Sequence, residues 1–530
     1  MCAGRSILCG AKGADMLSKI YSSGVVGIEG YEVTVECSAW DRIPAFELVG
    51  LPDAAVKEAK NRVRAACENS GFVFPALDLM VNLAPADIKK EGTAFDLAIL
   101  CAILQCDGII SRDFDFSDKC LIGELSLSGE VRAVTGVLPM VIAARDEGHK
   151  EVYVPTDNVK EAAVVSGIKV YPVSSLKELV DHFRMVAPIE PAPSELAKID
   201  LSNHADAPDF ADVCGQLKAK RALEIAAAGG HNVLMIGPPG TGKSMLAKRL
   251  ASILPDMDFE EALETTKIHS VGGDLRTGLM TDRPFRSPHH TITVPGLAGG
   301  GAHPRPGEIS LAHNGVLFLD ELPEFPKNVT EALRQPLEDG VVTVIRAAAK
   351  VRYPASFMLV CAMNPCRCGY FGDSNRRCTC TPQMRTKYLQ KISGPMLDRI
   401  DIEIELPSVS YDDISRKNMT GERSEVIRAR VNAAREFANA RLAAAGDATG
   451  LLNAKMPPKL IARHCKLDDS ASALMKEAFE SLGFSARAHD RVLRVARTIA
   501  DLDGSANITE DHVAEAIMYR TLERKYWKHG

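Results

Sequence analysis

The 530-residue sequence has no apolar run long enough to span a membrane, and its first thirty residues lack the continuous apolar segment of a secretion signal. It also lacks an excess of basic charge, because 63 lysine and arginine residues against 69 aspartate and glutamate residues give a formal net charge of −6. A nucleic-acid site must therefore be a local basic patch. We expect a soluble cytoplasmic protein that has no membrane partner.

Cysteine is present in number, but the chain lacks the composition of a disulfide-stabilised protein. Fourteen cysteines in 530 residues do not make a disulfide framework. Most of them, such as Cys101 and Cys106 in an apolar helical stretch, are expected to be buried thiols. Hydrophobic residues make up 46% of the sequence, which is ample for packed cores, and the length favours about three domains.

The sequence around residue 240 has the pattern of a phosphate-binding loop, G-x-x-x-x-G-K-[ST]. An apolar run at 232–236 precedes it and a helical pattern at 245–254 follows it, which is the context that the motif requires. Glycines let backbone N–H groups surround phosphate oxygens at a helix N-terminus, whereas a merely structural turn needs no such arrangement. We expect Lys243 to reach the β- and γ-phosphates of ATP and Ser244 to hold Mg²⁺. The expected nucleotide-binding residues are Gly237, Pro238, Pro239, Gly240, Thr241, Gly242, Lys243 and Ser244.

A second apolar run ends in two acidic residues about 75 residues after this loop. Residues 315–319 predict a buried strand, and open α/β sheets bind ligands at the carboxyl ends of such strands. If these two acidic residues stood alone, an exposed strand end with no binding role would be the alternative interpretation. Behind a phosphate-binding loop, we expect Asp320 to hold Mg²⁺ through water and Glu321 to polarise the water that attacks ATP.

Four cysteines form two C-x-C pairs in a glycine-containing loop. In a cytosolic protein this pattern fits tetrahedral Zn²⁺, although the spacing is tighter than the usual C-x₂-C, and two redox-labile dithiols are the alternative. Four thiolates leave no position for water, so the zinc site would be structural. The expected ligands are Cys366, Cys368, Cys378 and Cys380. The basic residues beside them form a candidate contact with a nucleic-acid backbone: Arg376, Arg377, Arg385 and Lys387.

The rest of the chain divides by pattern. Residues 1–185 alternate strand-like and helix-like segments, which predicts a mixed α/β domain, and the proline-rich 186–208 predicts a linker. Residues 283–307 contain too much glycine and proline for a core element, and we interpret His289 and His290 as loop residues rather than metal ligands. From residue 426 onward four helices are predicted, at 426–442, 470–482, 485–500 and 509–522, the last capped by Thr509.

Four segments of the first domain carry a resemblance to a known family: 48–53 (LVGLPD), 82–87 (NLAPAD), 90–96 (KEGTAFD) and 123–131 (GELSLSGEV). They resemble the N-terminal domain of the YifB/ComM family of magnesium-chelatase-like AAA+ ATPases, which is similar to the proteolytic domain of Lon. The serine and lysine of a Lon-type dyad fall on Ala94 and Leu138. Because the dyad needs a hydroxyl and an amine, the resemblance implies a proteolytically inactive Lon fold rather than an active protease with displaced catalytic residues.

The resemblance covers essentially the whole chain and implies an α/β architecture of three parts. These are a Lon-protease-like domain at 1–185, a P-loop AAA+ core at 209–410 that includes the zinc loop 366–380, and a helical lid at 411–530. Asn364 is the expected sensor-1 residue. Arg399, in the motif 397–400 (LDRI), is the expected arginine finger and would reach the γ-phosphate bound by a neighbouring subunit. Arg487 matches sensor 2 best, with Arg491 and Arg494 as alternatives.

The family resemblance also suggests the activity. The strand-like runs 341–345 and 351–354 predict a hairpin, which in this family points into the pore of a hexamer; Arg346, Lys350 and Arg352 lie on it or beside it, although a solvated surface is the simpler interpretation of these charges. We expect a hexameric, ATP-driven translocase that acts as a branch-migration helicase on branched or single-stranded DNA, in recombination or DNA uptake, with recombination proteins as possible partners. The alternatives are a magnesium-chelatase-like motor, an ATP-gated scaffold and, less favoured, an ATP-dependent protease.

Overall fold

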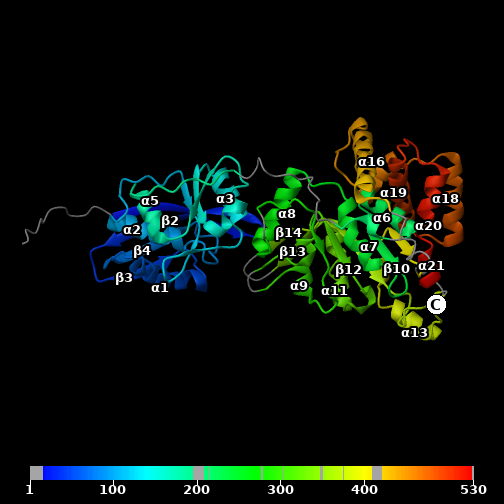
Figure 1. The fold of residues 1–530 in the computed structure, drawn as a ribbon, viewed down its shortest axis with the longest axis horizontal. Coiled ribbons are helices and arrows are strands. Elements are labelled where there is room, and N and C mark those ends of the chain that lie inside the picture. Colours follow the sequence, from blue (N-terminus) through cyan, green and yellow to red (C-terminus); the bar gives the residue numbers. More distant parts are fainter. Residues whose placement is uncertain are drawn as a thin grey trace, which may run out of the picture. The chain divides into compact units, whose positions relative to one another are not determined.

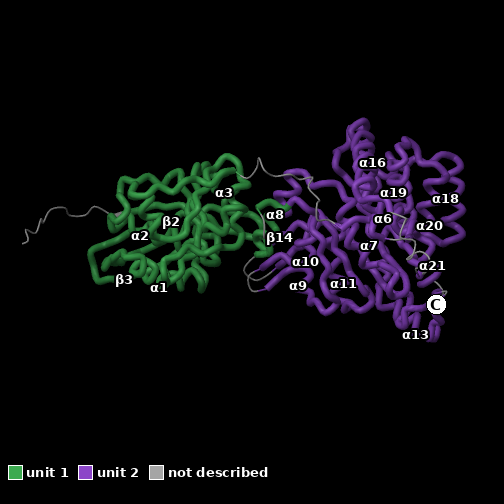
Figure 2. Tube along the Cα trace, in the orientation of Figure 1, with its two compact units in different colours: residues 1–199, 266–280 green, residues 200–265, 281–530 purple. Residues whose placement is uncertain are grey.

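The computed structural model describes residues 16–194, 208–213, 215–275, 278–301, 304–345, 350–373, 375–408 and 421–527. The chain divides into two compact units (Figure 2). Unit 1 comprises residues 1–199 together with 266–280, and unit 2 comprises residues 200–265 and 281–530. The predicted linker at 186–208 falls mostly outside the described residues. Among the helices that are described, none combines the length and the apolar character needed to cross a membrane.

Unit 1 is built on a seven-stranded mixed sheet with the order β3-β4-β2-β1-β5-β8-β9. β1 and β2 form a long antiparallel hairpin, and β4 adds antiparallel to β2. The remaining neighbours pair in parallel. The mixed α/β fold predicted for this part is therefore confirmed. The strands are β1 (Met16–Val26), β2 (Glu29–Trp40), β3 (Ala45–Val49), β4 (Asp78–Ala84), β5 (Lys119–Leu121), β8 (Glu151–Pro155) and β9 (Lys169–Val173).

The helices of unit 1 follow the apolar spacing of the sequence. α1 begins after Asp53, whose carboxylate accepts the Val56 N–H at 2.7 Å, and it buries one face of small and β-branched side chains. α2 is buried along nearly its whole length. A short hairpin is formed by β6 (Glu124–Leu125), which pairs antiparallel with β7 (Val131–Arg132). The helices are α1 (Ala54–Asn69), α2 (Asp96–Asp107), α3 (Val137–Asp146), α4 (Val159–Ala162) and α5 (Leu176–Phe183).

Unit 2 contains a five-stranded sheet with the order β11-β12-β15-β10-β16, and all its paired strands run parallel. β10, β12 and β15 are buried at every position, as their continuous apolar runs predict. Because the strands are parallel, their carboxyl ends share one edge of the sheet, here called the carboxyl edge, and their amino ends share the opposite amino edge. The strands are β10 (Val233–Ile236), β11 (Phe285–Arg286), β12 (Val316–Leu319), β15 (Met358–Met363) and β16 (Ile402–Glu405).

Helices and a hairpin complete the part of unit 2 around this sheet. The predicted hairpin is confirmed as β13 (Val341–Ile345) paired antiparallel with β14 (Lys350–Pro354), while Arg346 lies outside the described residues. The helices are α6 (Leu217–Gly229), α7 (Lys243–Leu250), α8 (Phe259–Gly272), α9 (Val294–Ala298), α10 (Glu308–Leu311), α11 (Lys327–Glu331), α12 (Arg334–Asp339), α13 (Pro382–Leu389) and α14 (Gly394–Leu397). α8 ends in the segment 266–280, which belongs to unit 1.

Six α-helices, rather than the four predicted helices, are described between residues 421 and 527. The predicted helix 509–522 is wrong in extent, because it ends at Met518 and a separate helix begins at Leu522. Thr509 caps its start as predicted, and His512 completes a capping box. The helices are α16 (Ser424–Ala444), α17 (Pro458–His464), α18 (Asp469–Leu482), α19 (Ala486–Leu502), α20 (Glu510–Met518) and α21 (Leu522–Tyr526). Figure 1 labels all of them except α17, in colours from gold to red.

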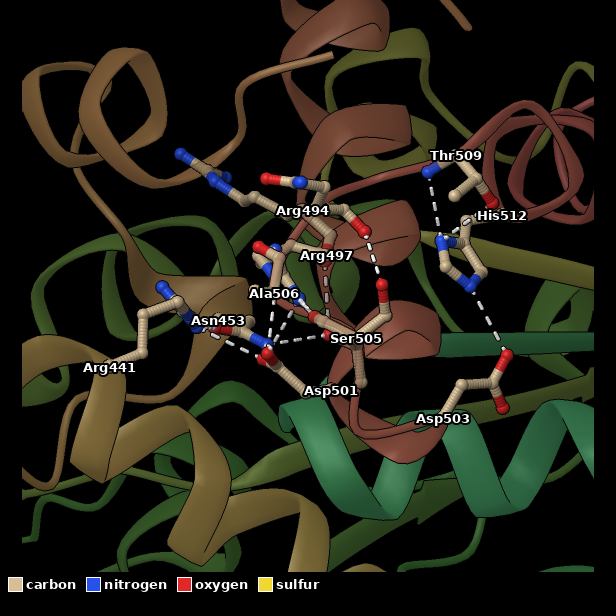
Figure 3. Close-up of polar contacts among 12 residues, drawn as sticks. Arg441, Asn453, Arg494, Arg497, Asp501, Asp503, Ser505, Ala506, Thr509 and His512 are labelled. Carbon is tan, nitrogen blue, oxygen red and sulfur yellow. Dashed lines mark hydrogen bonds and ion pairs between the residues drawn. The ribbon is translucent and has the colours of Figure 1, made fainter. Parts of the chain in front are cut away.

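The carboxyl-terminal half of α19 is anchored by a buried polar network (Figure 3). Arg497 is fully buried and pairs with Asp501 at 3.0 Å, and it donates to the Ala506 carbonyl at 2.9 Å. Asp501 also accepts from Arg441 of α16 at 3.0 Å and from Asn453 at 2.7 Å. A buried charge is stable only when it is paired and hydrogen-bonded in this way. The network fixes the orientation of α19 against the neighbouring helix.

Candidate nucleotide and metal sites

The phosphate-binding loop connects β10 to α7 at the carboxyl edge of the unit 2 sheet. Gly240 and Gly242 have φ angles of +81° and +88°, and a Cβ added at either would meet no atom within 4 Å. The glycines are therefore needed for backbone conformation rather than for space. The Thr241 hydroxyl donates to the Pro238 carbonyl at 3.0 Å and closes the loop on itself. This is the strand, loop and helix arrangement that phosphate binding requires.

The Lys243 side chain points into the centre of this loop. Its Nζ donates to the carbonyls of Gly237 at 2.7 Å and Pro238 at 2.9 Å, and to Asn364 Oδ1 at 3.3 Å. Burial lowers the pKa of the Lys243 amine to about 8, although the carboxylates of Asp320 and Glu321 act in the opposite direction. The structure thus brings the expected phosphate-binding lysine together with the expected sensor-1 asparagine.

The acidic pair follows β12 at the same edge. Ser244 Oγ donates to Asp320 Oδ2 at 2.6 Å, so a hydroxyl and a carboxylate lie together, which are the oxygen ligands that Mg²⁺ prefers. The Glu321 N–H donates to Asp320 Oδ1 at 3.0 Å. Glu321 itself adopts a φ of +54°, which is unusual for a residue with a side chain and is typical of strained functional positions. Its side chain is 57% exposed and is available to water.

His290 is a residue of this site that the sequence pattern did not reveal. Its Nδ1 lies 3.7 Å from Glu321 Oε2, and its ring lies against that of His289, with centroids 4.0 Å apart and planes tilted by 34°. The interpretation of both histidines as loop residues agrees with their position between β11 and α9. The contact with Glu321 arises because β11 pairs with β12, and strand order cannot be seen in the sequence.

The expected arginine finger and sensor 2 lie at the amino edge, at the opposite end of the same strands. A cavity of about 510 Å³ is lined there by residues at the strand starts, such as Asn232 before β10 and Phe357 before β15. It is also lined by the four arginines named from the sequence: Arg399, Arg487, Arg491 and Arg494. The structure therefore gathers these four arginines in one place and separates them from the phosphate-binding loop of their own chain.

The four arginines differ in their burial and in the hydrogen bonds and ion pairs that they make within their own chain. Arg399 is mostly buried; its guanidinium pairs with Glu338 and donates to the Pro395 carbonyl at 2.7 Å. Arg491 is also buried and donates to Asp398 at 3.2 Å, and Arg494 donates to the Met456 carbonyl at 2.7 Å. Arg487, by contrast, has a side chain that is 74% exposed and only a 3.6 Å contact with Asp398.

Asn232 holds the backbone of the arginine-finger motif in place and was not singled out from the sequence. Its Nδ2 donates to the Arg399 carbonyl at 2.8 Å, and its Oδ1 accepts the Leu359 N–H at 2.9 Å. Its backbone N–H donates to Asp401 at 3.2 Å. One amide side chain therefore ties β10, β15 and the segment before β16 together beneath Arg399.

The four cysteines of the predicted zinc loop converge on one point. Their Sγ atoms all lie within 4.8 Å of one another, and three of the pairs are 3.4, 3.6 and 3.7 Å apart. A tetrahedron with Zn–S bonds of 2.3 Å has sulfurs about 3.8 Å apart, so the cluster fits zinc. Backbone N–H groups of Cys368 and Cys380 point at sulfurs of the cluster, each at 3.4 Å, as thiolate ligands favour.

Aromatic and basic side chains pack on one another beside the cysteines. The Arg376 guanidinium lies 5.2 Å from the centre of the Tyr370 ring, and that of Arg385 lies 4.2 Å from the Phe371 ring. Arg376, Arg377 and Lys387 are exposed. The basic patch expected at this position is thus a surface feature of unit 2.

In unit 1, the two positions that align with a Lon-type dyad are buried and apolar. Ala94 is 5% exposed and Leu138 is fully buried. Neither offers a hydroxyl or an amine, and neither faces solvent, so a serine–lysine dyad is not present at these positions.

Comparison with known proteins places the whole chain in one family. Three family models match it: "Magnesium chelatase, subunit ChlI" at residues 209–414, "Subunit ChlI of Mg-chelatase" at 35–158 and "Magnesium chelatase, subunit ChlI C-terminal" at 421–520. The chain is 43% identical over 515 residues to Competence protein ComM of Haemophilus influenzae, with 96% of this chain and 98% of that protein covered. It is 41% identical over 510 residues to the uncharacterized protein YifB of Escherichia coli, with the same coverage.

A shorter match bears on the Lon-like prediction. The chain is 29% identical over 147 residues to Lon protease of Azospirillum brasilense, which is 26% of this chain and 18% of that protein. This is a local likeness, whereas the two relatives above match from end to end. The chain belongs to the YifB/ComM family of magnesium-chelatase-like proteins.

Proposed function

We propose that the protein is an AAA+ ATPase that assembles into a ring, most simply a hexamer, and moves along DNA. One observation carries the proposal: the residues suited to ATP and the arginines suited to its γ-phosphate lie at opposite edges of one parallel sheet. A site of this kind is completed only when the amino edge of one subunit meets the carboxyl edge of the next.

The carboxyl edge supplies the parts of an ATP-hydrolysing site. ATP would supply the phosphoryl group and Mg²⁺ the charge that neutralises it. The loop 237–242 and Lys243 would hold the phosphates, and Ser244 and Asp320 would hold the metal ion. Glu321 and Asn364 would orient the attacking water. Catalysis of phosphoryl transfer is mostly positioning and charge stabilisation, and the close contacts among these side chains support that role.

The distance between the edges supports a ring. β10 has four residues, which span about 13 Å at the usual rise of a strand. That is longer than an arginine side chain, so Arg399 and Arg487 cannot complete the site of their own subunit. Arg487 is the exposed member of the arginine group and would be the first to meet a neighbour, while Arg399 would exchange its pairing with Glu338 for the phosphate.

Two surface features of unit 2 support DNA as the polymer along which the protein moves. Lys350 and Arg352 are exposed on β14 of the hairpin, and the basic and aromatic patch lies beside the cysteine cluster. Basic side chains bind the phosphate backbone without reading sequence, and aromatic rings stack on bases. A relative that covers 96% of this chain is named Competence protein ComM, which supports a role in DNA uptake or recombination. Recombination proteins would be the natural partners there.

The four cysteines would hold one structural Zn²⁺. Four thiolates saturate the metal and leave no open position, so the ion would stabilise the loop 366–380 rather than take part in chemistry. Binding energy of this kind is folding energy for the segment that carries the ligands.

The test is ATP hydrolysis with and without single-stranded, double-stranded and four-way-junction DNA. Hydrolysis should rise with DNA, and with ATP and Mg²⁺ the junction should separate into two duplexes while simple duplexes remain paired. Binding should weaken steeply with salt and depend little on sequence. A double variant sharpens the test. Lys350→Ala combined with Arg352→Ala should reduce junction separation and leave basal ATP hydrolysis unchanged. If ring-forming protein hydrolyses ATP but does not bind the junction at low salt, the protein does not move along DNA. An ATP-gated scaffold is then the function that the data support.

A further inference from the structure

The cysteine loop and the nucleotide site are neighbours in the fold as well as in the sequence. β15 ends at Met363, Asn364 follows at the carboxyl edge, and the first cysteine comes two residues later. Cys366 is fully buried, unlike the other three ligands, and therefore lies on the core side of the cluster. Only Pro365 separates Asn364 from Cys366, so a shift of the cluster also moves Asn364.

Gly369 packs directly on the phosphate-binding loop. Its N–H donates to the Cys366 carbonyl at 3.0 Å, which closes a turn inside the cysteine loop. Its φ is +89°, and a Cβ at this position would lie 2.7 Å from Pro239 Cδ and 3.9 Å from Asn364 Cγ. Real Cβ atoms do not approach a ring this closely. The turn therefore fits between Pro239 and Asn364 only because residue 369 has no side chain.

The far end of the cysteine loop returns to the same asparagine. α13 begins at Pro382, directly after Cys380 and its capping residue Thr381. Near the end of that helix, the buried Tyr388 lies close to the backbone of Asn364. Both ends of the loop thus lie beside Asn364, whose Oδ1 accepts from Lys243 Nζ.

We propose that the metal bound by the four cysteines positions Asn364 and the phosphate-binding loop, so that metal occupancy sets the rate of ATP hydrolysis in the same subunit. The proposal rests on the ATPase function proposed above and adds a regulatory link to it. The four sulfurs hold the turn at Gly369 in place only when a metal neutralises and joins them. A displacement of about 1 Å at a positioning residue can cost about a hundredfold in rate, so release of the metal slows hydrolysis without removing any catalytic group.

Gly369→Ala tests the link while keeping all four ligands. Gly372→Ala is the matched control, because Gly372 lies in the same loop with a φ of +80°, so alanine is equally strained there. The nearest atoms to its added Cβ are Glu405 Oε1 at 3.9 Å and Lys525 Nζ at 4.0 Å, and neither belongs to the nucleotide site. Both variants should bind about one zinc per chain. Gly369→Ala should lose at least about tenfold in turnover, and more in turnover than in nucleotide affinity, whereas Gly372→Ala should hydrolyse ATP like the wild type.

Metal removal from the wild-type protein provides the second arm. Under a chelator, turnover should fall in proportion to the zinc lost and return when Zn²⁺ is added back, with circular dichroism showing that the protein stays folded. The proposal is overturned if Gly369→Ala with full zinc matches Gly372→Ala, or if folded, zinc-free protein turns over at the wild-type rate. No hydrolysis by the zinc-loaded wild type would overturn the proposed function itself, so the wild-type rate tells the two failures apart.

Discussion

At the carboxyl edge of the unit 2 sheet, hydrogen bonds of 2.6 to 3.3 Å join Lys243 to Asn364 and to the loop backbone, and Ser244 to Asp320. At the amino edge, Arg487 leaves 74% of its side chain exposed beside a cavity of about 510 Å³. The contrast recurs along α19, where Arg497 and Asp501 are buried and paired while Arg487 at the other end is open (Figure 3 shows the buried part). Buried charges that are fully paired support the fold, whereas an exposed arginine at the rim of a cavity is free to act on another molecule.

The largest effect should come from the carboxyl edge. Lys243→Ala removes the buried charge that faces the phosphates, so nucleotide binding and hydrolysis should fall to background. Glu321→Gln should still bind ATP but hydrolyse it at least about a hundredfold more slowly, because the water loses its polarising carboxylate. Lys248→Ala, an exposed lysine of the same helix, is the control and should behave like the wild type. Normal turnover by Glu321→Gln would remove that residue from the mechanism.

The pKa of Lys243 gives a second way to probe this edge. Burial lowers it to about 8 in the nucleotide-free protein, so the amine is charged below pH 8 and loses its proton above it. Phosphates bind the charged form, and binding at higher pH must take up a proton. Nucleotide affinity should therefore be constant below about pH 8 and fall by up to about tenfold per pH unit above it. An affinity that stays constant to pH 9.5, measured by fluorescent-nucleotide titration, would contradict this assignment.

The cysteine cluster should also contribute to the stability of unit 2. Metal analysis should find about one zinc per chain, and serine at any of the four cysteine positions should lower the zinc content and reduce the melting temperature by about 5 °C or more. Lys243→Ala keeps all four ligands and serves as the control, since its zinc content should equal that of the wild type. Full zinc retention in a variant with all four cysteines replaced would refute the metal site.

Much of the carboxyl edge could be predicted from the sequence because its parts are local. A phosphate-binding loop needs a fixed spacing of glycine and lysine between a strand and a helix, and Asp320 directly follows its strand. Other features depend on strand order and packing. His290 reaches Glu321 only because β11 lies beside β12, and Gly369 meets Pro239 only because β15 lies beside β10.

The helical region shows the same limit. The apolar spacing continues past Met518, but the helix ends there because the Tyr519 carbonyl accepts the Glu403 N–H at 2.9 Å and Arg520 donates to the Ile400 carbonyl at 2.7 Å. These are contacts with β16 and the residues before it, more than a hundred residues away in the sequence. α17 was missed because the prolines at its start, Pro457 and Pro458, are typical of loops as well as of a first helical turn.

The smallest effect is expected in unit 1, and it sharpens the contrast between the two units. With ATP and Mg²⁺, casein or peptide degradation should be undetectable, because Ala94 and Leu138 supply neither nucleophile nor base. Ala94→Ser adds a hydroxyl without a base and should remain inactive. Degradation that disappears in Lys243→Ala, in a preparation free of other proteases, would show that unit 1 is an ATP-driven protease after all.

The central claim, that one subunit's amino edge completes the next subunit's carboxyl edge, is tested most directly by mixing inactive variants. Arg399→Ala protomers keep an intact phosphate-binding loop, and Lys243→Ala protomers keep an intact arginine. In mixed rings some interfaces join the two intact halves, so ATP hydrolysis should recover in part, with a maximum at intermediate mixing ratios. No recovery at any ratio, in rings shown by mass spectrometry to contain both variants, would contradict an arginine that acts on the neighbouring subunit.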